Sequence, residues 1–177
     1  IDSEIGKILF FGICTDTGFF RFLDADSSDV FYAISRLVSK GANPRETYSE
    51  INSGKPFSTR KLLGLMLTHS EQYFDGKLIV TYETLDDTKK FGKDGRDSDS
   101  LYQLLLSVDG VQAVLFVRQD TDKTCTAGFR SKDAIDVSTI AAKFSGGGHK
   151  NAAGLSTEGT IDTLLPQIIK EFEKVLN

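Results

Sequence analysis

The stretch that decides the fold is residues 145–154, which reads SGGGHKNAAG. Three consecutive glycines let a backbone pass closer to other groups than residues with a Cβ allow. The N–H groups of such a run can converge on an anion, and His149 can donate to a phosphate oxygen or receive a proton. No Gly-Lys-Ser/Thr follows, so the run is not a nucleotide P-loop. The alternative is a flexible linker with an incidental histidine, which the apolar flanks Phe144 and Leu155 disfavour.

Hydrophobic periodicity around this stretch predicts a mixture of strands and helices. We expect strands at 77–82, 111–118 and 124–130, and helices at 97–107, 137–144 and 162–176. The last two strands should form a hairpin. Upstream we expect helices at 28–40, 44–52 and 58–73, the last of them ended by Asp75-Gly76.

A second candidate site follows residues 7–15 (KILFFGICT), a continuous apolar run that we interpret as a buried strand. Asp16 then lies at the carboxyl end of this strand, where open α/β sheets bind their ligands. Its carboxylate suits Mg²⁺ or Mn²⁺. The alternative is an aspartate that satisfies only the amides of the turn with Thr17 and Gly18.

A third candidate is residues 129–132 (FRSK), at the end of the second hairpin strand. Arg130 offers a forked donor to phosphate, and Lys132 offers a point charge. Taken alone, this segment is better explained as a solvated strand end.

Composition bounds the class of protein. The chain has 177 residues and a formal net charge of −4, enough for one domain or two small ones. Its acidic excess lies in residues 70–123, and no basic stretch resembles a duplex-DNA footprint. No apolar run reaches the roughly 20 residues of a membrane span. The chain opens without Met or a signal peptide, so we expect a cytoplasmic protein cut from a longer one.

The two cysteines, Cys14 and Cys125, lie far apart in apolar surroundings. We interpret them as buried free thiols, which fits a reducing compartment. Together with His69 and His149 they lack the spacing of a zinc site.

In combination these segments resemble the DHH phosphoesterases that carry a C-terminal DHH-associated domain. Residues 12–22 (GICTDTGFFRF) are similar to that family's G-I-x-T-D-T-G-x-F-R motif. Residues 129–132, the GGGH of 146–149 and the AAG of 152–154 are similar, in order and spacing, to the signature of the associated domain. Within the family the resemblance is to bacterial oligoribonucleases that also act as 3′-phosphoadenosine-5′-phosphate phosphatases.

The resemblance implies roles for matching positions. Asp16 matches a ligand of a two-metal site, usually manganese. The positions that match groups holding the nucleotide and its phosphate are Arg130, Ser131, Gly147, Gly148 and His149. Two departures stand out: the family's early Asp-x-Asp motif and its Asp-His-His motif are expected upstream of Ile1, and Ser145 stands where relatives often have glycine. One ligand cannot hold two metals, so we expect no catalytic residue here beyond Asp16.

The implied organisation is α/β throughout. Residues 1–57 would be the end of a DHH catalytic domain, 58–75 a connector helix and 76–177 a smaller substrate-binding domain. The implied function is part of a metal-dependent phosphodiesterase or phosphatase, an exonuclease acting on short RNA and phosphorylated adenosine nucleotides. The alternative is an RNA-binding module like the C-terminal domain of alanyl-tRNA synthetases. A third possibility is an exopolyphosphatase- or RecJ-like enzyme, and oligomerisation stays open.

Overall fold

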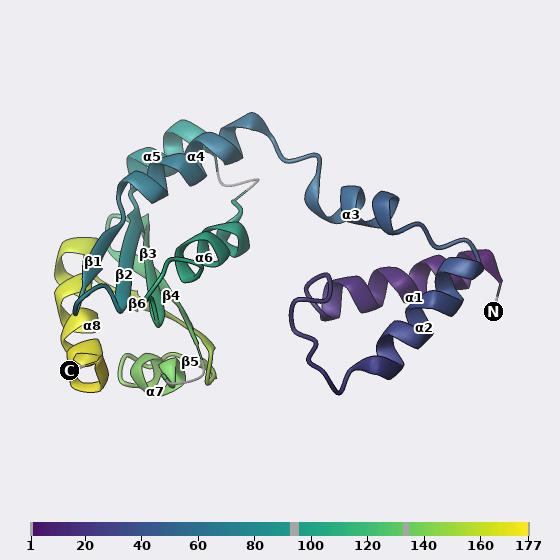
Figure 1. Cartoon of the computed structure of the whole chain (residues 1–177). Coiled ribbons are helices and arrows are strands. Elements are labelled where there is room, and N and C mark those ends of the chain that lie inside the picture. The colour runs from purple at the N-terminus through teal and green to yellow at the C-terminus, as the bar shows by residue number, and fades with distance from the viewer. Residues whose placement is uncertain (1, 93–95, 133–134, 177) are drawn as a thin grey trace. The chain divides into compact units, whose positions relative to one another are not determined.

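The computed structural model describes residues 2–92, 96–132 and 135–176. The chain divides into two compact units, residues 1–55 and 56–177 (Figure 1). The helix that we expected as a connector therefore groups with the second unit. The assignment of residues 1–57 to a catalytic domain stays a prediction.

The first unit consists, in its described part, of three helices. They are α1 (Ser3–Asp16), α2 (Ser28–Ser39) and α3 (Pro44–Asn52). The last two were predicted and are confirmed: Pro44 stands in the first turn of α3, and the side chain of Asn43 accepts hydrogen bonds from the amides of Arg45 and Glu46.

The strand predicted at residues 7–15 is wrong, because this run belongs to α1. Asp2 caps the helix by accepting a hydrogen bond from the amide of Ile5 at 2.9 Å. Phe10 and Cys14, one turn apart, are buried against the other helices of the unit. The solvent-facing side of α1 also carries apolar residues, such as Ile8, which is 70% exposed. With apolar residues on both sides, the sequence shows no helical period.

The second unit is a mixed α/β domain built on one six-stranded sheet (Figure 1). Its elements are α4 (Phe57–Thr68), β1 (Glu71–Tyr73), β2 (Leu78–Glu83), α5 (Leu85–Phe91), α6 (Ser98–Leu106), β3 (Ala113–Thr121), β4 (Thr124–Ser131), α7 (Val137–Ala142), β5 (Gly147–His149), β6 (Ala152–Glu158) and α8 (Ile161–Leu176). The strand order is β1-β2-β3-β4-β6-β5. Only the β2–β3 pair is parallel, and the predicted β3–β4 hairpin is confirmed.

Each face of the sheet has its own core. Leu115, Phe129 and Leu155 face α7 and α8, which contribute Ile140 and Phe172. The other face carries a second core between the sheet and the helices α4 and α6. This second core includes Leu62, Met66, Ile79, Leu101, Tyr102, Val114 and Phe116. Figure 1 shows α8 and α6 on opposite sides of the sheet.

The strands β1, β5 and β6 and the helix α5 were not expected from the sequence. The helix expected to reach Tyr73 ends at Thr68, and residues 71–73 form β1, antiparallel to β2. The Asp75-Gly76 signal marks the turn between these strands, where both residues have positive φ. Three residues are too few to show a strand period in the sequence.

Candidate substrate-binding face

Small residues form a floor on one face of the sheet at β4, β6 and β5. Gly128 lies opposite Gly154, which lies opposite Gly147. Residues paired across strands point to the same face, and Gly128 is also paired with Phe116 of the α4–α6 core. The floor therefore continues the face that α4 and α6 cover at β2 and β3, but here the glycines are half-buried or exposed.

Arg130 and His149 stand on this floor, on either side of one alanine. Arg130 is paired with Ala152, and Ala152 is paired with His149. Two strand spacings separate the Cα atoms of Arg130 and His149, about 10 Å. Both side chains project from the same face, so a phosphate above Ala152 lies within reach of both. The sheet register thus brings together two of the predicted binding residues.

The Arg130 guanidinium is oriented by neighbours from α6. Its central carbon lies 4.7 Å from the centre of the Tyr102 ring, a cation–π contact. One nitrogen lies 4.0 Å from a carboxylate oxygen of Asp99, and another donates to the carbonyl of Phe129 at 3.1 Å. The side chain keeps 34% of its surface exposed. It is therefore held in place by these neighbours, while about a third of its side-chain surface stays accessible to a ligand.

The glycine run forms an edge strand instead of a loop of converging amides. The Gly146 amide is used within the protein, since it donates to the Ala141 carbonyl at 2.9 Å. Gly148 has φ 144°, and a Cβ there would lie 2.5 Å from the Ala152 carbonyl oxygen. A Cβ at Gly147 would meet nothing within 4 Å. Gly146 and Gly148 thus serve close packing, whereas Gly147 lies open to solvent.

Ser131 faces away from Arg130. It is paired with Ala113 of the opposite core, and only 7% of it is exposed. Its hydroxyl donates to the Ile135 carbonyl at 2.7 Å and lies 3.4 Å from the Lys150 carbonyl. The hydroxyl therefore ties the end of β4 to the turn that follows His149.

Asp16 is the last residue of α1 and is exposed. A carboxylate is unfavourable at a helix C-terminus, and the last turn of α1 holds no basic residue. Local helix energetics therefore do not explain this residue. Within residues 2–92, 96–132 and 135–176, no group of three or more His, Cys, Asp or Glu side chains could hold a metal ion. Asp16 alone does not make a two-metal site.

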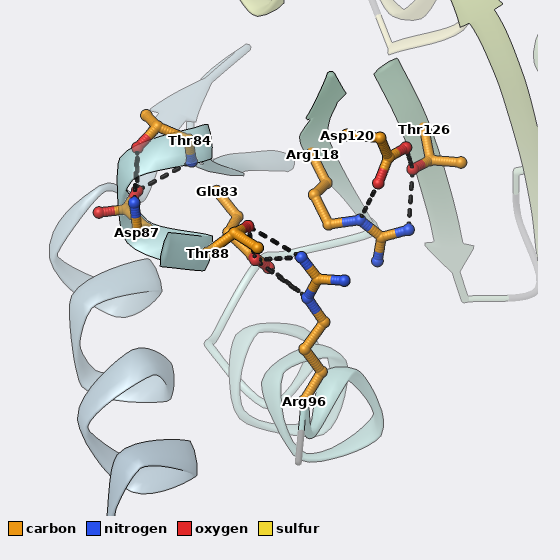
Figure 2. A network of polar contacts seen from close by, with 8 residues as sticks. All are labelled: Glu83, Thr84, Asp87, Thr88, Arg96, Arg118, Asp120 and Thr126. Atoms are coloured by element: carbon orange, nitrogen blue, oxygen red, sulfur yellow. Dashed lines mark hydrogen bonds and ion pairs between the residues drawn. The ribbon is translucent and has the colours of Figure 1, made fainter. Parts of the chain in front are cut away.

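Sequence reasoning missed a polar cluster at the other end of the floor. Arg118, from β3, donates from Nε to Asp120 at 2.7 Å and from Nη2 to Thr126 at 2.9 Å (Figure 2). The Thr126 hydroxyl in turn donates to Asp120. Burial alone would raise the pKa of Asp120, but the hydrogen bonds from Thr126 and Arg118 outweigh it and lower the pKa. The period-two alternation of Thr126, Gly128 and Arg130 was the signal available in the sequence.

A cavity of about 200 Å³ opens between this cluster and α6. Its lining includes Ser98, Tyr102, Arg118, Thr126 and Gly128. Tyr102 was expected only as a helix residue, because no local pattern reports which strand a helix will cover. Burial raises its pKa to about 12, although Arg130 and Arg118 act in the opposite direction. Tyr102 therefore stays protonated at neutral pH.

A buried ion pair holds the segment that leads into α6. Glu83, at the end of β2, is completely buried, and its carboxylate accepts a hydrogen bond from the Arg96 guanidinium at 2.5 Å (Figure 2). The Thr88 hydroxyl donates to the same carboxylate oxygen at 2.6 Å. Arg96 lies two residues before Ser98, the first residue of α6. The pair therefore fixes where α6 begins, next to the floor.

A larger cavity, of about 500 Å³, lies elsewhere on the second unit. His69, Tyr82 and Asp162 are among its lining residues, and it contains none of the predicted binding residues. The His69 and Tyr82 rings stack at 4.5 Å. The larger of the two cavities is therefore not the candidate binding site.

The fold and the site define an α/β domain that presents an arginine and a histidine over a glycine floor at one sheet edge. The family model for the DHHA1 domain matches residues 75–177. The chain therefore belongs to the DHHA1 domain family, as the GGGH and FRSK segments indicated.

Relatives agree with this assignment. The chain is 31% identical over 157 residues to the bifunctional oligoribonuclease and PAP phosphatase NrnA of Thermus thermophilus, covering 89% of this chain and 46% of that protein. It is 26% identical to the protein of the same name from Bacillus subtilis, covering 88% and 48%. The solved structure of an exopolyphosphatase-related protein from Bacteroides fragilis matches with a TM-score of 0.85 and 29% identity, over 99% of this chain and 50% of that one.

The chain thus spans about half the length of the curated relatives it matches. Among the described residues, no helix is both long and apolar enough to cross a bilayer.

Proposed function

We propose that the chain is the substrate-binding part of a metal-dependent phosphodiesterase and phosphatase that acts on short oligoribonucleotides and phosphorylated adenosine nucleotides. Two relatives are named as oligoribonucleases and PAP phosphatases. The observation that carries the proposal is the cross-strand row of Arg130, Ala152 and His149 beside the glycine floor. A forked cation and an imidazole on one exposed face suit a phosphate group.

Each predicted binding residue receives a role in this proposal. Arg130 binds phosphate through its fork, and His149 donates to a phosphate oxygen. Gly147 leaves room for the ligand, whereas Gly148 lets β5 lie close to β6. We assign Ser131 a positioning role, because its hydroxyl is already used by two carbonyls near the His149 turn.

Asp16 would supply one carboxylate to a two-manganese site of the full-length enzyme. Bound metals would activate water and stabilise charge on the phosphoryl group. The further ligands are expected from other parts of that enzyme, which fits the half-length coverage of the relatives. In this proposal residues 1–57 are the end of the catalytic domain, 58–75 the connector and 76–177 the substrate-binding domain.

Calorimetric titration of the chain with adenosine and with AMP tests the phosphate-binding role. AMP should bind more tightly than adenosine. Arg130→Gln should weaken AMP binding by about 1.5–3 kcal/mol, the value of a hydrogen bond to a charged group. Arg130→Lys should recover only part of this, because an ammonium lacks the fork. The charge-matched control is Lys170→Gln, an exposed position on α8 across the sheet, which should bind like wild type.

Equal affinity for adenosine and AMP would contradict phosphate recognition by this face. Tight binding of structured tRNA without any mononucleotide binding would favour the alternative, an RNA-binding module.

A further inference from the structure

The cavity beside Gly128 lies next to the phosphate row without belonging to it. We infer that this cavity, lined by Ser98, Tyr102, Arg118 and Thr126, is a second anion subsite that takes a phosphate two nucleotides further along a single-stranded phosphodiester chain. The inference rests on the proposed function, because the first phosphate is the one placed at Arg130 and His149.

The Tyr102 hydroxyl is the observation that points to a ligand. Only 7% of Tyr102 is exposed, yet the residue lines the cavity. A Cβ on Gly128 would lie 2.1 Å from its hydroxyl oxygen, so this oxygen sits directly on the glycine floor. Among the residues that the structure describes, none makes a hydrogen bond to it. The oxygen is not itself fully enclosed, so a ligand oxygen in the cavity can accept a hydrogen bond from it.

Arg118 supplies the charge. Its Nε and Nη2 atoms are held by Asp120 and Thr126, which fix the guanidinium plane. The third nitrogen, Nη1, has no partner among the described residues, and Figure 2 shows it apart from both of these contacts. The side chain is 26% exposed. A preorganised guanidinium loses little conformational entropy when it binds an anion.

The N-terminus of α6 adds to this site. Ser98 is the first residue of this nine-residue helix and lines the cavity. The positive end of the helix dipole favours an anion there. Three carboxylates lie near this helix end: Asp97 pairs with Arg60 at 2.6 Å, Asp120 pairs with Arg118, and Asp99 lies 4.0 Å from Arg130. They balance much of the local positive charge, so the subsite recognises an anion through its directed donors, Arg118 Nη1 and the Tyr102 hydroxyl, more than through net charge.

The spacing of the two subsites indicates the class of ligand. Thr126 and Arg130 are four residues apart on β4, about 13 Å along the strand. Tyr102 lies between them, because its hydroxyl lies at Gly128, its ring contacts Arg130, and it lines the same cavity as Arg118. A mononucleotide with one phosphate fills only one subsite. Successive phosphates of one strand lie closer together than this, so a chain with three phosphates can fill both subsites with its first and third, and the small residues between the subsites leave room for the nucleosides.

The test compares AMP with 5′-phosphorylated triadenylate by calorimetry on the whole chain. We expect the wild-type chain to prefer the trinucleotide by about tenfold, the effect of one added charged contact. Tyr102→Phe and Arg118→Gln should each bring this ratio close to one, whereas Lys170→Gln should leave it unchanged. Tyr102→Phe should also melt at the wild-type temperature, since the hydroxyl has no described partner to lose. This variant keeps the test valid if Arg118→Gln folds poorly.

Several outcomes overturn the inference. A wild-type ratio of one, together with AMP binding that depends on Arg130, refutes the second subsite and leaves the proposed function standing. No binding of either nucleotide refutes both. An unchanged ratio in Tyr102→Phe refutes the role of the hydroxyl. Inorganic phosphate is the third probe: if it raises the melting temperature in a Tyr102-dependent way while the trinucleotide has no advantage, the cavity is a free-anion site.

Discussion

Glu83→Gln removes one charge from the completely buried ion pair with Arg96 and keeps the side-chain volume. One carboxylate oxygen of Glu83 accepts from Arg96 at 2.5 and 2.9 Å and from Thr88 at 2.6 Å. The other accepts only one contact, at 3.1 Å. The glutamine carbonyl can take the first position, so the main loss is the charge that balances Arg96.

Breaking a buried ion pair costs about 3–5 kcal/mol when the remaining charge is fully buried. Arg96 is 19% exposed and can turn partly toward water, which reduces this cost. We expect the free energy of unfolding of the second unit to fall by about 2 kcal/mol. For a unit of this size that corresponds to a decrease in melting temperature of about 8 °C.

Urea unfolding measures this change, followed by far-ultraviolet circular dichroism because the chain has no tryptophan. Glu158→Gln, at the exposed end of β6, is the matched control and should stay within about 0.5 kcal/mol of wild type. Replacing Glu83 and Arg96 together by leucine should cost less than Glu83→Gln, because no unpaired charge remains. A Glu83→Gln change below about 0.5 kcal/mol would refute the reasoning.

Three further changes test the site and its surroundings. Gly148→Ala should detach β5 and lower both stability, by about 1–3 kcal/mol, and AMP binding; Gly147→Ala has open space and should lower binding alone, so equal stability losses would contradict the distinction. Asp16→Ala should leave thermal stability unchanged or raise it by about 0.3–1 kcal/mol, and abolish turnover in a full-length enzyme; a clear loss of stability would make Asp16 a structural residue. The pKa of Tyr102 is about 12 in the folded protein and near 10 in the unfolded chain, so the contribution of Tyr102 to stability is complete below pH 10 and is lost as the pH rises from 10 to 12. Urea unfolding across this pH range should show a steeper loss of stability for the wild type than for Tyr102→Phe. Parallel curves would contradict this prediction.

The sequence predicted long periodic elements well and the first helix poorly. Helices α2 and α8 have one apolar and one polar face, so their period was visible. Residues 7–15 are apolar on every side, and a run of that length fits a buried strand equally well. What decides for the helix is the Asp2 cap and the burial of Phe10 and Cys14 one turn apart.

Sequence reasoning likewise found one part of the candidate site and missed another. Arg130 and His149 were predicted individually, and the sheet register brings them to one face. Once residues 124–131 are known to form a strand, Ser131 must face the side of the sheet opposite to Arg130, because successive side chains in a strand alternate between faces. Tyr102 and Arg118 could not be assigned, since their proximity depends on how α6 packs across the sheet. Such long-range packing leaves no local pattern in a single sequence.

The small residues of the site have two separate physical roles, and only one of them concerns the ligand. At Gly146 and Gly148 a Cβ would come within 2.6 Å of backbone or core atoms, so these positions are required for the fold of the β5–β6 edge. At Gly147 and Gly154 a Cβ would meet nothing closer than 3.4 Å, so packing does not require glycine there. Side-chain volume at these two positions would instead stand on the floor beside Gly128. The fold therefore accounts for two of these four glycines, and the proposed ligand would account for the other two.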